Sequence, residues 1–115
     1  MKRILAPILL LTLLFPSIAM GETVKWDDLE ERDGLYYKKF TEVPFTGKTT
    51  GKIQGSFKNG KTHGPWVFYY ENGQLYYKGT YKDGKMDGPW VGYNKDGTVS
   101  EYFTGTFKDG VRVSD

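Results

Sequence analysis

Short runs of aromatic and β-branched residues alternate with Asn-Gly or Asp-Gly pairs along most of the chain. These pairs are Asn59-Gly60, Asn72-Gly73, Asp83-Gly84, Asp96-Gly97 and Asp109-Gly110. They favour two-residue hairpin turns, because the type I′ turn needs a positive φ at both central residues. The pattern therefore predicts an all-β chain of consecutive antiparallel hairpins, with three earlier strands at residues 35–40, 45–49 and 52–57.

The hairpin around Asn72-Gly73 can be paired residue by residue. A two-residue turn places Tyr70 opposite Leu75, Phe68 opposite Tyr77 and Trp66 opposite Gly79. Side chains alternate between the two faces of a strand, so these residues share one face. The opposite face then carries Val67, Tyr69, Tyr76 and Lys78. Trp66 faces a glycine, and an aromatic ring over a strand glycine is an established packing device.

The next hairpin is built around Asp96-Gly97. The same count pairs Asn94 with Val99 and Trp90 with Phe103. Two more residues separate the turn from the following repeat glycine here than in the preceding hairpin. An insertion of two preserves the alternation, so Phe103 and Phe107 are expected on the Trp90 face.

These hairpins belong to a tandem repeat. The segment that begins at Gly55 recurs at Gly79, an offset of 24, and a shortened copy begins at Gly105, after a further 26. A period of this size is typical of repeat architectures. We divide the chain into residues 22–34 as a polar lead-in and 35–115 as the repeat domain, with a degenerate repeat at 35–54, full repeats at 55–78 and 79–104, and a partial repeat at 105–115. The repeated turn and packing residues, for which we expect structural roles, are Gly55, Gly64, Pro65, Trp66, Gly73, Gly79, Gly84, Gly88, Pro89, Trp90, Gly97 and Gly105.

The repeated pattern is Gly-x-[Tyr/Phe]-Lys-[Asn/Asp]-Gly-Lys-x-x-Gly-Pro-Trp-Val-x-Tyr-x-x-[Asn/Asp]-Gly, carried by residues 55–73 and 79–97. It resembles the variant MORN (membrane occupation and recognition nexus) repeat of bacterial proteins. The resemblance implies a curved, single-layer antiparallel sheet of stacked hairpins. Some members of that family are classed as antitoxin or immunity-like proteins that bind a toxin partner.

Residues 1–21 have a different character. Lys2 and Arg3 precede an apolar run over residues 4–15, and Ala19-Met20-Gly21 places small residues before a cleavage point. This is the pattern of a secretory signal peptide cleaved after Gly21, which predicts an exported protein, periplasmic or secreted, of a bacterium. An uncleaved membrane anchor is the alternative. Cleavage removes two of the 16 basic residues and leaves 14 against 14 acidic ones, and formal neutrality argues against a nucleic-acid partner.

Few residues could carry catalysis or bind a metal. The one histidine, His63, aligns with Asp87 in the next repeat, and a catalytic base needs a positioned partner. One histidine without any cysteine cannot form a zinc site of the usual composition. We therefore expect no enzyme activity and no catalytic, cofactor or metal site.

Aromatic residues make up 17% of the chain, and a single-layer sheet has little else to bury. We interpret the Trp66 and Trp90 face as the packed face and Tyr69, Tyr76 and Tyr93 as partner-binding residues, since exposed aromatic patches mark interaction sites. The predicted function is a non-enzymatic protein-interaction module of the bacterial envelope. The alternatives are a peripheral membrane-surface binder that uses lysines and tyrosines, a toxin-neutralising protein, and a small hydrolase or carbohydrate-active protein.

Overall fold

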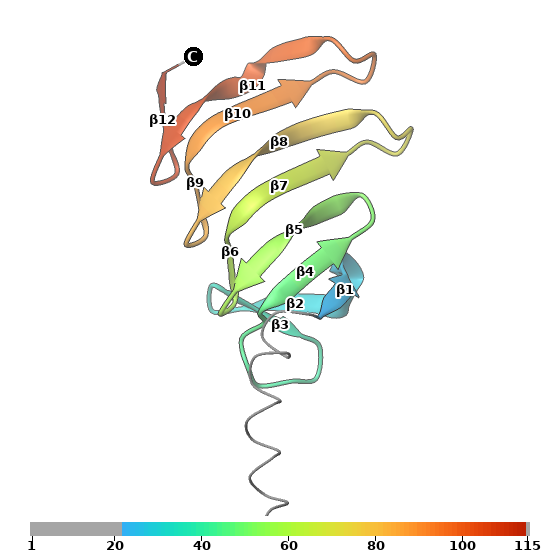
Figure 1. Ribbon diagram of the computed structural model, residues 1–115, viewed down its shortest axis with the longest axis vertical. Helices are drawn as coiled ribbons and strands as arrows, with labels where there is room; N and C mark the ends of the chain where they lie inside the picture. Colours follow the sequence, from blue (N-terminus) through green and yellow to red (C-terminus); the bar gives the residue numbers. More distant parts are fainter. Residues whose placement is uncertain (1–21, 115) are drawn as a thin grey trace, which may run out of the picture.

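The computed structural model describes residues 22–114. The predicted signal peptide or anchor lies outside the described residues. The predicted all-β meander of hairpins is confirmed: the main sheet has the strand order β1-β4-β5-β7-β8-β10-β11-β12. Its neighbouring strands are antiparallel apart from β1 and β4, which are parallel. Figure 1 shows the strands stacked one above another along a single curved sheet.

The strands of the repeat region follow the chain in order. They are β4 (Gly47–Thr50), β5 (Ile53–Lys58), β6 (Lys61–Thr62), β7 (Gly64–Tyr69), β8 (Leu75–Lys82), β9 (Lys85–Met86), β10 (Gly88–Tyr93), β11 (Val99–Lys108) and β12 (Val111–Ser114). The short strands β6 and β9 pair with the ends of β5 and β8. Gly64 and Gly88, each with a φ near +90°, then begin β7 and β10. Each Gly-Pro pair therefore stands at the start of a strand, as expected for proline.

The segment 22–34 is more than a polar lead-in. It forms β1 (Thr23–Lys25), a 3-10 turn at Trp26–Asp28 and β2 (Leu29–Arg32), and β2 pairs with β3 (Leu35–Lys38). Leu29 is buried, and the Trp26 ring lies 6.4 Å from that of Trp66. The pair β2–β3 therefore caps the first repeat, as terminal units of repeat proteins do.

The Asx-Gly pairs form two kinds of turn. At Asn59-Gly60, Asp83-Gly84 and Asp109-Gly110 both residues have positive φ, as the predicted type I′ turn requires. At Asn72-Gly73 and Asp96-Gly97 only the glycine does, so the prediction of two-residue turns at these pairs is wrong.

Those two hairpins have three-residue loops instead. The Gly73 N–H donates to the Tyr70 carbonyl (3.0 Å), and the Tyr70 N–H donates to the Gln74 carbonyl (2.9 Å). The Asn72 side chain accepts the Gln74 N–H (2.9 Å), a local bond that an asparagine offers in a turn. A type I turn followed by a left-handed glycine is the result.

The longer loop shifts the pairing close to it. Tyr69 faces Leu75, so the predicted Tyr70–Leu75 pair is wrong. A β-bulge at Tyr76 then restores the predicted register, and Phe68 faces Tyr77 and Trp66 faces Gly79. A bulge sets two residues of one strand against one of its partner, which offsets the extra loop residue.

The hairpin of β10 and β11 contains a larger irregularity. Trp90 pairs with Gly105 and not with Phe103, and Tyr93, in place of Asn94, pairs with Val99. Residues 101–104 all lie opposite Val91, between the pairs Gly92–Ser100 and Trp90–Gly105. The two-residue insertion is therefore absorbed in a wide bulge of β11, which gives Trp90 the same glycine partner position that Trp66 has.

Candidate interaction surface

One face of the sheet is closed by its own aromatic rings. Trp66 is 1% exposed and Trp90 0% exposed. Edge-to-face contacts surround them: Phe57 lies 5.1 Å from Trp66, and Tyr81 lies 5.9 Å from Trp66 and 5.0 Å from Trp90 between ring centroids. We call this the closed face. Its rings contact one another along the stack and form the main hydrophobic core of the described residues, with Trp26 and Tyr36 packed against Phe57 at the N-terminal end.

The tryptophans cover a different glycine from the one expected. A Cβ on Gly55 would stand 2.0 Å from Cδ2 of Trp66, so this indole lies over the preceding strand. Gly79, although it is the Cα partner of Trp66, is covered by Trp90 instead. The predicted pairing of Trp66 with Gly79 is therefore correct, but the predicted covering ring is wrong. The Trp66 side chain leans away from Gly79 on β8 and toward Gly55 on β5.

On the opposite face the described residues form no such cluster of rings. Cross-strand pairing puts Val67 beside Lys78 and Lys78 beside Val91. Tyr69 and Tyr93 follow two residues after the valines and therefore share their face. We call Val67, Tyr69, Lys78, Val91 and Tyr93 the open face. It includes a shallow hollow of about 310 Å³ whose lining contains Pro65, Val67, Lys78, Pro89 and Val91.

Tyr69 and Tyr93 fit the predicted binding role by their position. Within residues 22–114 neither ring packs against another ring, and both side chains are partly exposed. Their side chains are thus available to a partner, while the closed face keeps the sheet folded without them.

Tyr76 does not belong to this group. Its ring lies 4.6 Å from Tyr70 and 6.0 Å from Phe103. The bulge turns Tyr76 to the same side as Tyr77, because both residues lie opposite Phe68. The expectation that Tyr76 shares a face with Tyr69 and Tyr93 is therefore wrong.

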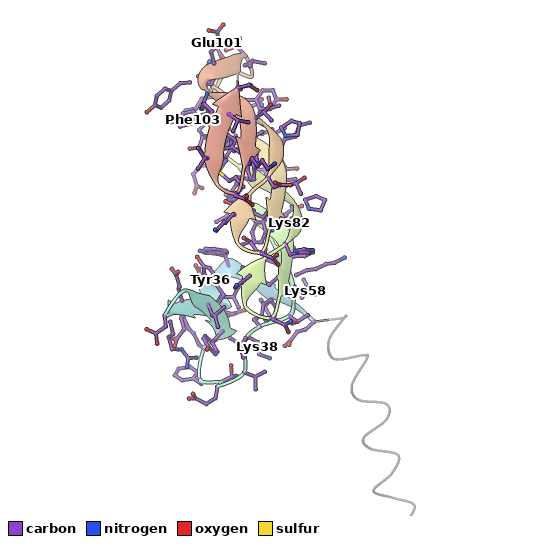
Figure 2. The ribbon with its side chains drawn as sticks, turned by 90° about the vertical axis from the view of Figure 1, so that its left-hand side faces the viewer. Tyr36, Lys38, Lys58, Lys82, Glu101 and Phe103 are labelled. Carbon is purple, nitrogen blue, oxygen red and sulfur yellow. The ribbon has the colours of Figure 1, made fainter. Side chains whose placement is uncertain are left out.

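Lysines line the edge of the sheet where the type I′ turns lie. Lys58 is the direct partner of Lys61, and Lys82 of Lys85, and all four are exposed. Figure 2 shows Lys58 and Lys82 at successive levels of the stack. Like charges directly opposite each other destabilise a sheet. The same pairing recurs in both full repeats, so this edge carries a regular row of positive charge.

Three half-buried tyrosines have perturbed acidity. Burial raises the pKa of Tyr36, Tyr77 and Tyr81, since removal from water disfavours the phenolate. Nearby Glu31 raises the pKa of Tyr36 further, and Tyr77 that of Tyr81. All three pKa values move away from neutrality, so these side chains stay protonated and serve as packing groups.

His63 lies in the loop between β6 and β7. Its Nδ1 is buried and has no hydrogen-bond partner in the described structure, so no group orients the ring through that nitrogen, as a catalytic base would need. No group of three or more His, Cys, Asp or Glu side chains suited to a metal ion occurs in residues 22–114.

Sequence reasoning missed two exposed features at the ends of the stack. Phe40, expected in a strand, lies beyond the end of β3 with a φ of +67° and is 99% exposed. Tyr102, in the wide bulge of β11, is 79% exposed. The two-residue insertion after Gly97 was the only signal that pointed to the second of them.

The sequence model of the MORN repeat matches residues 54–75 and 77–89. These segments run from β5 to the start of β8 and from within β8 to the start of β10, so two segments of the chain match the MORN repeat. Comparison with curated proteins and with solved structures gave no significant match. The MORN repeat is a non-catalytic module that generally mediates contacts with proteins or membranes. A helix long and apolar enough to cross a bilayer is absent from the part of the chain that the structure describes.

Proposed function

We propose that these MORN repeats form a non-enzymatic interaction module of the bacterial envelope, which binds a protein partner through the open face. The observation that carries the proposal is the difference between the two faces of one sheet. Trp66 and Trp90 are buried by neighbouring rings on the closed face. On the other side Tyr69 and Tyr93 share a face with Val67 and Val91, and within residues 22–114 no second layer of strands lies over that face.

The chemistry of the open face suits a protein surface. Tyrosine is enriched among the residues that contribute most to binding energy at interfaces, because it combines a large apolar ring with a hydroxyl group. The valines supply apolar area between the two rings. Lys78 is the one charged residue of the open face, so we expect binding to weaken only modestly with added salt.

The envelope location rests on the sequence of residues 1–21. Its positive start, apolar run and small residues are typical of a secretory signal peptide. We expect the exported form to begin at Glu22. Mass spectrometry of the protein recovered from the periplasm or medium checks this, and a retained N-terminal segment would favour the membrane anchor.

A pull-down tests the binding face. Parent protein and the variant Tyr69→Ser/Tyr93→Ser are used as bait in envelope extract, and captured proteins are compared by mass spectrometry. We expect the double variant to lose a partner that the parent captures. Glu71→Ser, which changes an exposed side chain in a hairpin loop outside the open face, is the control and should retain that partner. Capture of the same partner by the double variant would exclude this face.

The lysine edge supports a second candidate, a membrane-surface binder. Lys58, Lys61, Lys82 and Lys85 recur with the repeat and are exposed. Clustered basic residues are attracted to anionic lipid headgroups. Sedimentation with vesicles that contain phosphatidylserine tests it: a lipid-binding edge should give binding that falls steeply with salt and is lost in Lys61→Gln/Lys85→Gln.

A further inference from the structure

Large exposed apolar side chains gather at the two ends of the stack. Among residues 22–114 they are Phe40 and Val43 at one end, and Val99, Tyr102, Val111 and Val113 at the other. Figures 1 and 2 show these ends far apart, with the loop that follows β3 at the bottom and β11 and β12 at the top. The middle of the stack has no comparable residue in the described structure, so both patches belong to the ends.

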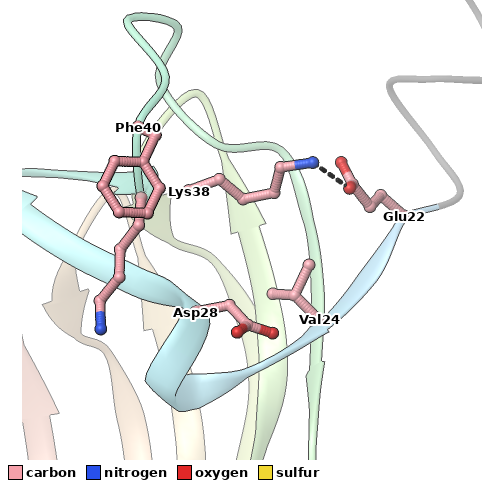
Figure 3. Close-up of a pocket in the computed structure, with 6 residues that line it drawn as sticks. Glu22, Val24, Asp28, Lys38 and Phe40 are labelled. Carbon is pink, nitrogen blue, oxygen red and sulfur yellow. Dashed lines mark hydrogen bonds and ion pairs between the residues drawn. The ribbon is translucent and has the colours of Figure 1, made fainter.

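A firmly held loop presents Phe40. The N–H and the hydroxyl of Thr41 both donate to the Lys38 carbonyl, at 3.1 and 2.7 Å. Lys38 itself forms an ion pair with Glu22 (Figure 3). Phe40 adopts the left-handed conformation that non-glycine residues rarely use, and such strain tends to occur at functional positions. The loop therefore projects Phe40, next to exposed Lys39, as an exposed apolar knob.

The opposite end offers a hollow. Glu101, Tyr102, Phe103 and Arg112 line a depression of about 520 Å³. The Tyr102 and Phe103 rings lie 4.8 Å apart, edge to face, and form its aromatic side.

The wide bulge that makes this hollow is braced by hydrogen bonds. The Thr104 hydroxyl donates to the Ser100 carbonyl at 2.7 Å. The Arg112 guanidinium donates to the carbonyls of Tyr102 and Thr104, both at 2.8 Å. The insertion in β11 is thus a built feature and not a loose loop.

We propose that the knob of one copy of this chain docks in the hollow of the next. Phe40 would contact Tyr102 and Phe103, and Lys39 would face Glu101. The ring contact is apolar on both sides, and Lys39 would pair with Glu101, while the Arg112 guanidinium that also lines the hollow stays on the carbonyls of Tyr102 and Thr104. Pairing of two identical ends would leave the other patch exposed, whereas this contact covers both.

A contact between opposite ends has a defined consequence. It is heterologous, so each copy can bind two others, and the assembly continues as an open array unless the rotation between copies closes it into a ring. The open face takes no part in it. An array would therefore present several open faces to a partner at once, and linked sites raise avidity without any new contact.

Sedimentation velocity over a concentration series tests this proposal. The protein is purified after expression of the whole chain, and each variant is checked for the same N-terminus and unfolding midpoint. The contact is small, and small interfaces are weak, so we expect the parent's average mass to rise only at high concentration. Phe40→Ser and Tyr102→Ser should each remain monomeric. Val67→Ser, on the open face, should associate as the parent does.

Two combinations make the test specific. An equimolar mixture of Phe40→Ser and Tyr102→Ser contains one intact knob and one intact hollow, so it should form dimers and nothing larger. Lys39→Glu should reduce association, and Lys39→Glu/Glu101→Lys should restore it.

Three results would overturn the proposal. The first is a parent that stays monomeric throughout the series. The second is loss of association in Tyr102→Ser but not in Phe40→Ser, which would indicate pairing of identical ends. The third is association unaffected by either variant together with binding of the parent, but not of Phe40→Ser, to neutral phosphatidylcholine vesicles, which would make lipid the occupant of the knob.

Discussion

The indole of Trp90 lies directly over Gly79, where a Cβ would stand 2.1 Å from Cδ2 of the ring. The indole N–H donates to the carbonyl of the next residue, Thr80, at 3.0 Å. Trp66 repeats the arrangement over Gly55 and donates to the Ser56 carbonyl at 3.1 Å. In each repeat a glycine and the tryptophan eleven residues later therefore form one packing unit, which joins two strands of the sheet.

Substitution of Gly79 should destabilise the protein through Trp90. Real Cβ atoms do not approach another atom this closely, so Gly79→Ala forces the indole or the strand to move. We expect a loss of about 1–3 kcal/mol in the free energy of unfolding, the usual cost of overpacking. Urea denaturation followed by fluorescence measures it.

A double-mutant cycle identifies the ring responsible. In a Trp90→Leu background the cost of Gly79→Ala should fall, because the clash is relieved. In a Trp66→Leu background it should remain. The opposite result would mean that Trp66, the Cα partner of Gly79, is the covering ring after all.

Gly73 should matter for a different reason. Its φ is +88°, and a Cβ there would meet nothing within 4 Å. We expect Gly73→Ala to cost about 1–2 kcal/mol through the left-handed backbone alone. Gly73→Asn should cost less, since asparagine adopts this conformation more readily. Equal losses for the two variants in urea denaturation would contradict a purely conformational cause.

High pH should unfold the protein through its half-buried tyrosines. Burial raises the folded-state pKa of Tyr81 above its ordinary value of 10.0. The unfolded chain therefore releases this proton first, so the contribution of Tyr81 to the free energy of unfolding is constant below about pH 10 and is lost as the pH rises through the folded-state pKa. Tyr81→Phe should reduce that fall. Urea denaturation between pH 8 and 11.5 checks it, and an unchanged slope in the variant would exclude Tyr81 as a cause.

The hairpin architecture could be predicted from the sequence because two separate features of the repeat require it. Turn glycines and the alternation of aromatic residues around Trp66 both require hairpins, and the central pairs Phe68–Tyr77 and Trp66–Gly79 occur as predicted. The turn types and the pairing next to the turns were harder to predict. Asn72 accepts a hydrogen bond from the Gln74 N–H in a three-residue loop, and an Asn-Gly pair by itself is equally compatible with the two-residue turn found at Asn59-Gly60.

Part of the candidate site was also predictable. Alternation placed Tyr69 and Tyr93 opposite the tryptophans, and the structure agrees. Tyr76 was misplaced because a bulge changes the face of a residue without changing the sequence pattern. The exposed position of Phe40 could not be predicted, because an aromatic residue that follows a strand resembles a continuation of that strand.

The different surroundings of these tyrosines lead to a last prediction. Tyr76 contacts Tyr70 and Phe103, and aromatic pairs of this kind contribute about 0.5–1.5 kcal/mol each. Tyr76→Ser should therefore lower the free energy of unfolding by about 1–3 kcal/mol. Tyr69→Ser/Tyr93→Ser removes two rings that have no ring neighbours in the described structure, so it should unfold close to the parent's midpoint.

Urea denaturation of the three proteins makes this comparison, with circular dichroism to show that each is folded at the start. If the double variant is the one that loses stability, Tyr69 and Tyr93 support the sheet itself. The open face would then be a second packed face, and loss of partner binding in that variant could not be assigned to the interface. A stable double variant that loses its partner would instead separate folding from binding, because the closed face alone would then account for stability.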